Sequence, residues 1–100
     1  MNAVFRALAD PTRREILALL RAAPRTAGDL ADHFPQTRST LSGHFNVLKA
    51  ANLVIAERQG QTILYRLNLS VFEEATAAVL AVFGVGRDKA RGRRREGVSS

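Results

Sequence analysis

Residues 37–67 restrict the possible fold more than any other part of this 100-residue chain. Three apolar residues at helical spacing, Leu41, Phe45 and Leu48, predict a helix in the first half of the segment. A short link follows, and Gly60 then separates two strand-like runs, as in a β-hairpin. A helix followed by a short link and a hairpin is typical of a winged helix-turn-helix, which is the fold that we predict.

The rest of the chain supplies helices before and after this segment, because start signals and apolar periodicity agree there. Asp10 before Pro11 and Thr26 before an acidic residue are favourable helix starts, and Ser70 with Glu73 forms a capping box. The predicted fold class is mainly α with one β-hairpin, in the order α-α-α-α-β-β-α. The predicted helices span residues 2–8, 11–23, 27–34, 38–50 and 70–83, and the predicted strands span residues 54–59 and 62–67.

The length and charge of the chain fit one domain with a basic extension. Residues 1–86 are predicted to form a single DNA-binding and dimerisation domain. Residues 87–100 contain six basic and two acidic residues, so they supply +4 of the formal net charge of +6. We expect these residues to form a disordered tail. An excess of positive charge favours a polyanion, such as double-stranded DNA, as the partner.

The composition also argues against several classes of protein. The absence of cysteine excludes disulfides and thiolate metal sites and is compatible with a reducing cytosol. The first residues lack the pattern of a signal peptide, and no apolar run is long enough to span a bilayer. The expected location is therefore the cytoplasm, without membrane insertion.

The predicted helix at 38–50 has one apolar stripe and otherwise polar side chains, which suits a DNA groove. The major groove of B-DNA admits one helix, whose first turns meet base edges and phosphates. Arg38 can pair with guanine or a phosphate, Asn46 can read adenine, and Lys49 suits a phosphate. Helix capping is an alternative role for Ser39 and Thr40. The predicted contacts from this helix are Arg38, Ser39, Thr40, Ser42, Gly43, His44, Asn46 and Lys49.

Several residues in or near this helix have two possible roles. Gly43 costs roughly 1 kcal/mol of helix stability relative to Ala and removes a side chain that could read a base. It either lets the backbone approach the DNA or leaves specificity to its neighbours. His44 either contacts DNA or packs, partly buried, between helices. Arg13 and Arg14 either touch a phosphate or form an ion pair with Glu15 or with an acid across an interface.

The hairpin and the terminal helices predict the remaining contacts. Alternating apolar residues along the hairpin indicate one packed face. The predicted contacts of its tip, with phosphates or with the minor groove, are Arg58, Gln59, Gln61 and Thr62. The apolar stripes of the first and last helices can be partly buried in the core of the monomer. The last stripe runs to the very end of its helix, where little of the monomer is left to cover it, so we predict a two-fold dimer. The predicted interface residues are Val4, Phe5, Leu8, Phe72, Thr76, Val79, Leu80 and Phe83.

In this order and spacing, several short motifs resemble the ArsR-type family of winged-helix repressors. The matching residues are ADPTRR at 9–14, TAGDLA at 26–31, LS at 41–42 with His44, LK at 48–49, LV at 53–54 and YRL at 65–67. The resemblance extends over about residues 4–83 and is strongest to small SdpR-like autorepressors without a metal site. It implies a homodimeric, sequence-specific repressor, with autoregulation as one mode of action and the terminal helices as the dimer interface. Gly43 departs from the family pattern, in which a longer polar side chain is usual.

Many members of that family sense metals through Cys pairs or through His and acidic ligands, which this sequence does not supply. The only two histidines, His33 and His44, lie on different predicted helices, so three or four ligands do not converge. No metal or other cofactor is therefore expected. The factor that relieves repression stays open between a small molecule, a partner protein and the protein's own concentration.

Three other functions are alternatives to DNA-dependent repression. An enzyme is disfavoured because Ser42 and His44 point to different faces of one helix and because no Gly-rich phosphate loop follows a strand. A protein-binding winged helix would favour an apolar wing tip, whereas this tip is polar and basic. A non-specific DNA-binding protein would show strong salt dependence with little preference between duplexes.

Overall fold

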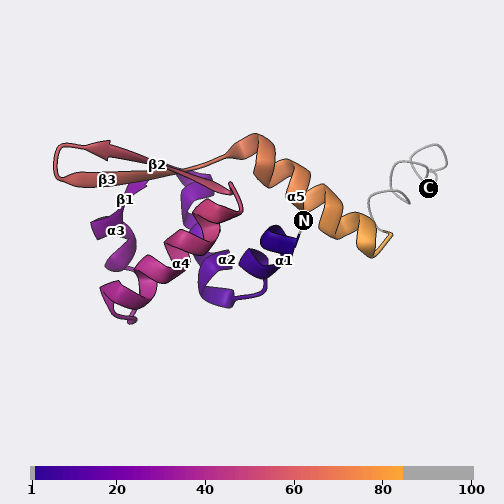
Figure 1. The fold of residues 1–100 in the computed structure, drawn as a ribbon, viewed down its shortest axis with the longest axis horizontal. Coiled ribbons are helices and arrows are strands. Elements are labelled where there is room, and N and C mark those ends of the chain that lie inside the picture. The colour runs from indigo at the N-terminus through magenta and orange to yellow at the C-terminus, as the bar shows by residue number, and fades with distance from the viewer. Residues whose placement is uncertain (1, 85–100) are drawn as a thin grey trace.

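The computed structural model describes residues 2–84 and has the predicted architecture of a winged helix-turn-helix (Figure 1). The tail predicted at residues 87–100 lies outside the described residues. The elements are α1 (Asn2–Leu8), α2 (Pro11–Ala22), β1 (Arg25–Thr26), α3 (Ala27–Ala31), α4 (Arg38–Ala50), β2 (Val54–Gln59), β3 (Thr62–Leu67) and α5 (Leu69–Val82).

Two of the three predicted helix starts are confirmed by the side chains that cap them. The Asp10 carboxylate accepts hydrogen bonds from the backbone N–H groups of Thr12 and Arg13, at 2.8 and 3.2 Å. The Thr26 hydroxyl accepts from the Asp29 N–H at 3.0 Å.

The capping box predicted at Ser70 is wrong, because α5 begins one residue earlier, at Leu69. Asn68 is the cap, and its side chain accepts from the Val71 N–H at 3.5 Å. The backbone N–H of Asn68 still bonds to the Leu53 carbonyl at 2.9 Å. The chain therefore leaves the sheet at Asn68, and an asparagine at that point is as good a cap as a serine.

Helix α3 is shorter than the predicted span of 27–34, because it ends at Ala31. The next backbone bonds, from His33 N–H to Leu30 and from Phe34 N–H to Ala31, are of the tighter i→i−3 kind. Pro35 disfavours helical geometry only at Phe34, and the residues between Ala31 and Pro35 leave the helix through these tighter turns.

The hairpin is part of a three-stranded antiparallel sheet with the order β1-β3-β2. The strands β2 and β3 have the predicted bounds, whereas the two-residue strand β1 was not predicted. Strand β1 pairs Arg25 with Tyr65 and Thr26 with Leu64, so it ties the start of α3 to the wing.

The sharp turn from α4 into β2 is made by Asn52, whose φ of 61° is left-handed. The Leu53 N–H then bonds to the Leu48 carbonyl at 3.0 Å, as in a helix that ends with a Schellman motif. This turn fixes where the wing leaves the end of α4.

The core lies between α2, α4 and the sheet, and the predicted stripe of Leu41, Phe45 and Leu48 is buried in it. The rings of Phe45 and Tyr65 meet with centroids 4.7 Å apart at an angle of 38°. Helix α5 is different, because Ala75 is its one buried residue. Figure 1 shows α5 leading away from this body beside α1, on the side opposite the hairpin tip.

Candidate DNA-binding surface

The turn between α3 and α4 places the first turn of α4 at the surface. Thr37 is the cap of α4: its hydroxyl accepts from the Thr40 N–H at 3.2 Å and donates to the Thr40 hydroxyl at 3.0 Å. The capping role considered for Ser39 and Thr40 is therefore taken by Thr37. Both residues remain exposed, together with Arg38.

The helical period divides the surface of α4 into an outer row and two flanks. The outer row, opposite the buried stripe, contains Ser39, Gly43 and Asn46, all exposed. One flank faces the sheet and carries Arg38, Ser42 and, further along the helix, Lys49. Arg38 and Ser42 line a cavity together with Ile63 and Tyr65 of β3. The other flank carries Thr40 and His44 and faces α2.

His44 occupies the partly buried position between helices that was one of its two predicted roles. Its imidazole side chain is 16% exposed, and its Nδ1 atom lies 3.0 Å from Nη1 of Arg13 on α2. A guanidinium has only donors, so Nδ1 of His44 accepts this bond and carries no proton. His44 thereby anchors α4 to α2.

Arg13 joins three elements through a single side chain. Its Nε and Nη2 atoms donate to the carbonyls of Ala7 and Arg6, each at 2.9 Å, where α1 ends. Arg14 donates to the Leu8 carbonyl at 2.8 Å. The ion pair with Glu15, one of the alternative roles considered for these arginines, is absent from residues 2–84, because both arginines bind the last carbonyls of α1 instead.

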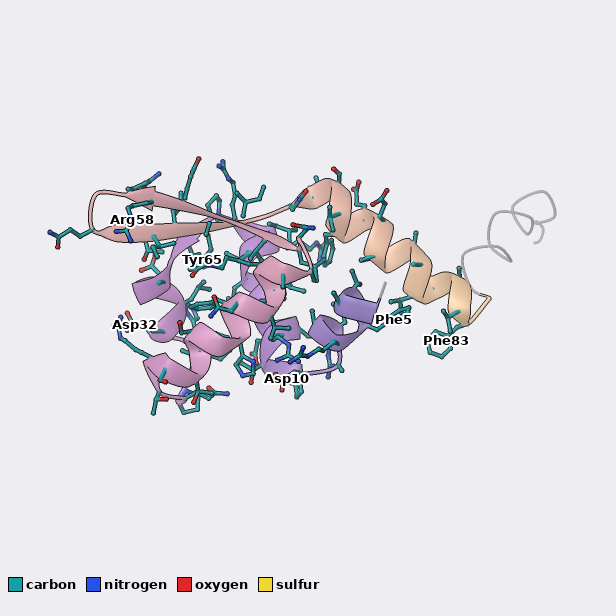
Figure 2. All side chains as sticks on the ribbon, viewed as in Figure 1. Phe5, Asp10, Asp32, Arg58, Tyr65 and Phe83 are labelled. Carbon is teal, nitrogen blue, oxygen red and sulfur yellow. The ribbon has the colours of Figure 1, made fainter. Side chains whose placement is uncertain are left out.

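Asp10 completes this cluster at the start of α2. Its Oδ2 atom lies 3.9 Å from Nδ1 of His44. Partial desolvation alone would raise the pKa of this carboxyl, but the N–H bonds of Arg13 and Thr12 and the nearby charge of Arg13 outweigh it, so its pKa lies below the ordinary value. Figure 2 shows Asp10 on the α1–α2 side of the molecule, away from Arg58.

The hairpin register determines which wing side chains share the face that packs on the body. Arg58 pairs with Ile63, and Ala56 pairs with Tyr65, so Arg58 lies on the packed face but beyond its buried part. The predicted packed face of the hairpin is confirmed: Val54 and Tyr65 are buried, and Ile63 and Leu67 are partly buried. Figure 2 shows Arg58 near the tip of the wing.

The turn at the wing tip contains only Gly60 and Gln61, because Gln59 pairs with Thr62. Gly60 has a φ of 63°, a conformation that favours glycine at this place in a tight hairpin. On the outer face, Arg66 pairs with Glu57 at 2.8 Å. Arg58 has its charge uncompensated among the described residues and only a long 3.5 Å bond to the Gly60 carbonyl.

All of the predicted DNA contacts except His44 are exposed, and they come from two elements, α4 and the β2–β3 tip. The predicted dimer residues divide differently. Val4 is buried in the monomer core, and Leu8, Phe72 and Val79 are partly buried. The exposed predicted interface residues are Phe5, Thr76, Leu80 and Phe83.

Val82 was not predicted as an interface residue, yet it is 69% exposed and lines one apolar hollow with Phe5, Val79 and Phe83. Phe83 is 74% exposed. Figure 2 shows Phe5 on α1 and Phe83 at the end of α5 on the same side of the molecule. The position of Val82 at the very end of α5 is the feature of the sequence that could have indicated an interface role.

Comparisons with known proteins agree with this geometry. Residues 8–57 match a family described as a helix-turn-helix domain. The transcriptional repressor SdpR of Bacillus subtilis (strain 168) is 47% identical over 75 residues, which are 75% of this chain and 83% of that protein. A solved structure described as an ArsR family transcriptional regulator is 32% identical, with a TM-score of 0.73 over 80% of this chain and 81% of that chain. This chain belongs to the ArsR family of transcriptional regulators.

A second solved structure, described as a possible transcriptional regulator for arsenical resistance, is 32% identical with a TM-score of 0.76. It covers 88% of this chain and 94% of that chain, so the similarity includes the winged fold and α5. ArsR-family proteins are transcriptional regulators and not enzymes, and this chain is accordingly a DNA-binding transcriptional repressor of that family.

Residues 2–84 offer neither a cluster of metal ligands nor a membrane-spanning helix. No group of three or more His, Cys, Asp or Glu residues in that range is placed to hold a metal ion. Within the same range, no helix has the length and apolar character needed to cross a bilayer.

Proposed function

We propose that this chain is a homodimeric repressor that reads an inverted-repeat operator with α4 in the major groove and the wing on the DNA backbone or in the minor groove. The observation that carries the proposal is that α4 has one buried apolar face and one exposed polar face. Its apolar stripe is buried, while the side chains of the opposite row, Ser39 and Asn46, are exposed and form no hydrogen bond or ion pair with another residue of 2–84. A helix of this kind fits the major groove.

The outer row and the sheet-side flank of α4 would contribute differently to recognition. Asn46 has the amide geometry that reads adenine, and Ser39 can donate to a base or a phosphate. Arg38 suits guanine or a phosphate, and Lys49 suits a phosphate. Thr40 and Ser42 would add contacts beside the outer row. His44 acts in this proposal through its position between α4 and α2 rather than through a base.

The wing would add a second, largely electrostatic contact. Arg58 offers an unneutralised guanidinium at the tip, with Gln59, Gln61 and Thr62 as hydrogen-bonding neighbours. A guanidinium that contacts a phosphate would release counterions condensed on the DNA, so binding would weaken as the salt concentration rises. The predicted basic tail would strengthen the same non-specific attraction.

The proposed dimer forms through the exposed apolar residues of α1 and α5. Phe5, Leu80, Val82 and Phe83 are each at least 40% exposed, which is costly for large apolar side chains that cluster. A two-fold dimer would cover these side chains and present the α4 helices of both subunits to one face of the DNA. The operator half-sites would then lie about 10–10.5 base pairs apart or at a multiple of that spacing.

The proposed regulatory target includes the protein's own promoter, because the similar SdpR is a transcriptional repressor and the chain resembles small autorepressors. Since the target would be chromosomal DNA, we expect the protein in the cytoplasm.

The proposal is tested by fluorescence anisotropy with the gene's own upstream DNA and a scrambled duplex, each at two salt concentrations. We expect a preference of about a thousandfold or more that persists at the higher salt concentration. Equal, salt-sensitive binding to both duplexes would contradict autoregulation and favour a non-specific DNA-binding protein. Absence of binding to both would favour a protein-binding winged helix.

A further inference from the structure

A half-open cavity of about 200 Å³ lies between α3, α4 and β3. Its wall is mostly apolar and is formed by Ala27, Ala31, Leu41, Phe45 and Ile63. Three polar side chains complete the lining: Arg38, Ser42 and Tyr65.

The volume of the cavity limits its occupant to a small molecule. An enclosed apolar cavity of roughly 150 Å³ accommodates a benzene molecule, so about 200 Å³ fits one six-membered ring with a small substituent. Phe45 and Tyr65, whose ring centroids are 4.7 Å apart, provide aromatic surface on one side. Aromatic rings pack favourably against such surfaces.

The polar groups of the lining favour an anionic substituent. Tyr65 is only 5% exposed, but its hydroxyl is not a fully buried atom and bonds to no other residue of 2–84, so it is accessible to a bound molecule. Burial raises the pKa of this hydroxyl, so it keeps its proton and can donate. Arg38 is the one charged residue of the lining, and it forms no ion pair with another described residue.

We propose that this cavity is the effector site of the repressor and that it binds a small aromatic carboxylate. The ring would pack against Phe45 and Ile63, and the carboxylate would accept hydrogen bonds from the Arg38 guanidinium and from the hydroxyls of Ser42 and Tyr65. Arginine matches a carboxylate with two parallel hydrogen bonds.

This inference rests on the proposed function, because Arg38 and Ser42 also belong to the proposed DNA contacts. A carboxylate held by Arg38 neutralises a charge that would otherwise meet a base or a phosphate. Ligand and DNA would therefore weaken each other's binding by the same factor. The effector would act as an inducer that releases the operator.

The direct test is titration of the DNA-free protein with benzoate, followed by ¹H–¹⁵N NMR. Benzamide, which has the same shape without the charge, is the matched probe. We expect saturable shifts at residues around the cavity with a dissociation constant of about 1 mM or lower, and binding of benzamide that is at least about tenfold weaker. Shifts that do not saturate by about 10 mM benzoate, or equal binding of the two probes, would overturn the proposal.

Three variants locate the bound molecule. Arg38→Gln removes the charge from an exposed position, Tyr65→Phe removes only the tyrosine hydroxyl, and Ala31→Met fills the cavity. We expect each to weaken benzoate binding at least about threefold, with Arg38→Gln having the largest effect. Arg58→Gln removes the same charge at the wing tip, outside the cavity, and should leave benzoate binding unchanged. Benzoate binding that is unaffected by Arg38→Gln and by Tyr65→Phe would place the molecule elsewhere and overturn the assignment.

A second measurement separates this inference from the proposed function. DNA binding of the same protein is measured by anisotropy with and without benzoate. DNA binding that is specific but insensitive to saturating benzoate would overturn the inducer role and leave the repressor assignment intact. Absence of specific DNA binding would contradict the proposed function, while the NMR titration would still decide whether the cavity binds carboxylates.

Discussion

Gly43 lies in the outer row of α4 although glycine weakens a helix interior, and this makes it the most revealing single position. A Cβ atom built at Gly43 has no neighbour within 4 Å, so the protein itself does not require glycine there. We expect Gly43→Ala to raise the free energy of unfolding by about 0.5–1 kcal/mol, measured by urea denaturation. If the DNA approaches the backbone at this point, the same variant should bind the operator several-fold more weakly.

The control for this prediction is Gly28→Ala in α3, where the added Cβ would lie 3.8 Å from the Thr26 hydroxyl, an ordinary contact distance. This variant should leave operator affinity unchanged. If Gly43→Ala is more stable and also binds operator as tightly as the original protein, no DNA atom lies close to residue 43.

Asp10 makes stability depend on pH on the acid side. Because its pKa is lower in the folded protein than in the unfolded chain, Asp10 contributes stability at neutral pH that is lost as the pH falls through the folded-state pKa, below about pH 4. Asn is also a good helix cap but does not titrate. We therefore expect Asp10→Asn to be less stable than the original protein at pH 7, with the difference shrinking between pH 4 and pH 3. Urea denaturation curves that differ by a constant amount across this range would argue against the role given to Asp10.

At the scale of elements, the wing is expected to act mainly through charge. Arg58→Ala should weaken binding to every duplex and reduce the slope of log affinity against log salt by about one unit. The measurement is fluorescence anisotropy over a series of salt concentrations.

Arg66→Ala is the matched control, because it removes the same charge from the outer face of the same hairpin. Its salt slope should stay that of the original protein. A slope that Arg58→Ala leaves unchanged, or that Arg66→Ala changes equally, would remove the wing tip from the DNA interface.

The elements that the sequence predicted well are those with a long pattern and a nearby start signal. The helix at Arg38–Ala50 and both hairpin strands were predicted to the residue, because an apolar period and a glycine turn act locally. Strand β1 was missed because two residues carry no periodicity, and it exists only through pairing with Tyr65 and Leu64. The start of α5 was misplaced because Asn68 and Ser70 are both good caps and only the end of the sheet decides between them.

The candidate site was predictable in composition but not in arrangement. The polar residues of α4 and the wing tip follow from the helix and strand patterns. The contact between Arg13 and His44 joins residues 31 positions apart, so no local pattern indicates it. The cavity beside Arg38 likewise depends on how α3 and β3 pack against α4, which the sequence alone does not specify.

At the scale of the whole molecule, the exposed end of α5 predicts assembly. Phe83→Ser should weaken dimerisation at least about tenfold, because a two-fold interface loses the aromatic side chain from both subunits. Sedimentation velocity over a range of protein concentrations measures the monomer–dimer equilibrium.

Ala81→Ser is the control, because Ala81 is exposed on the face of α5 opposite the apolar stripe. It should dimerise like the original protein. A monomeric original protein, or a Phe83→Ser variant that dimerises normally, would contradict an interface built from α1 and α5.

Selection of duplexes from a random pool tests whether a two-fold pair of α4 helices reads DNA sequence. We expect enrichment of an inverted repeat with half-sites about 10–10.5 base pairs apart or a multiple of that, bound about a thousandfold or more tightly than the starting pool. Selection with an Asn46→Ala variant should lose preference at one position in each half-site, because one base-reading side chain is missing. A selected pool with no shared motif, bound as weakly as the starting pool, would contradict the claim that this protein recognises a DNA sequence.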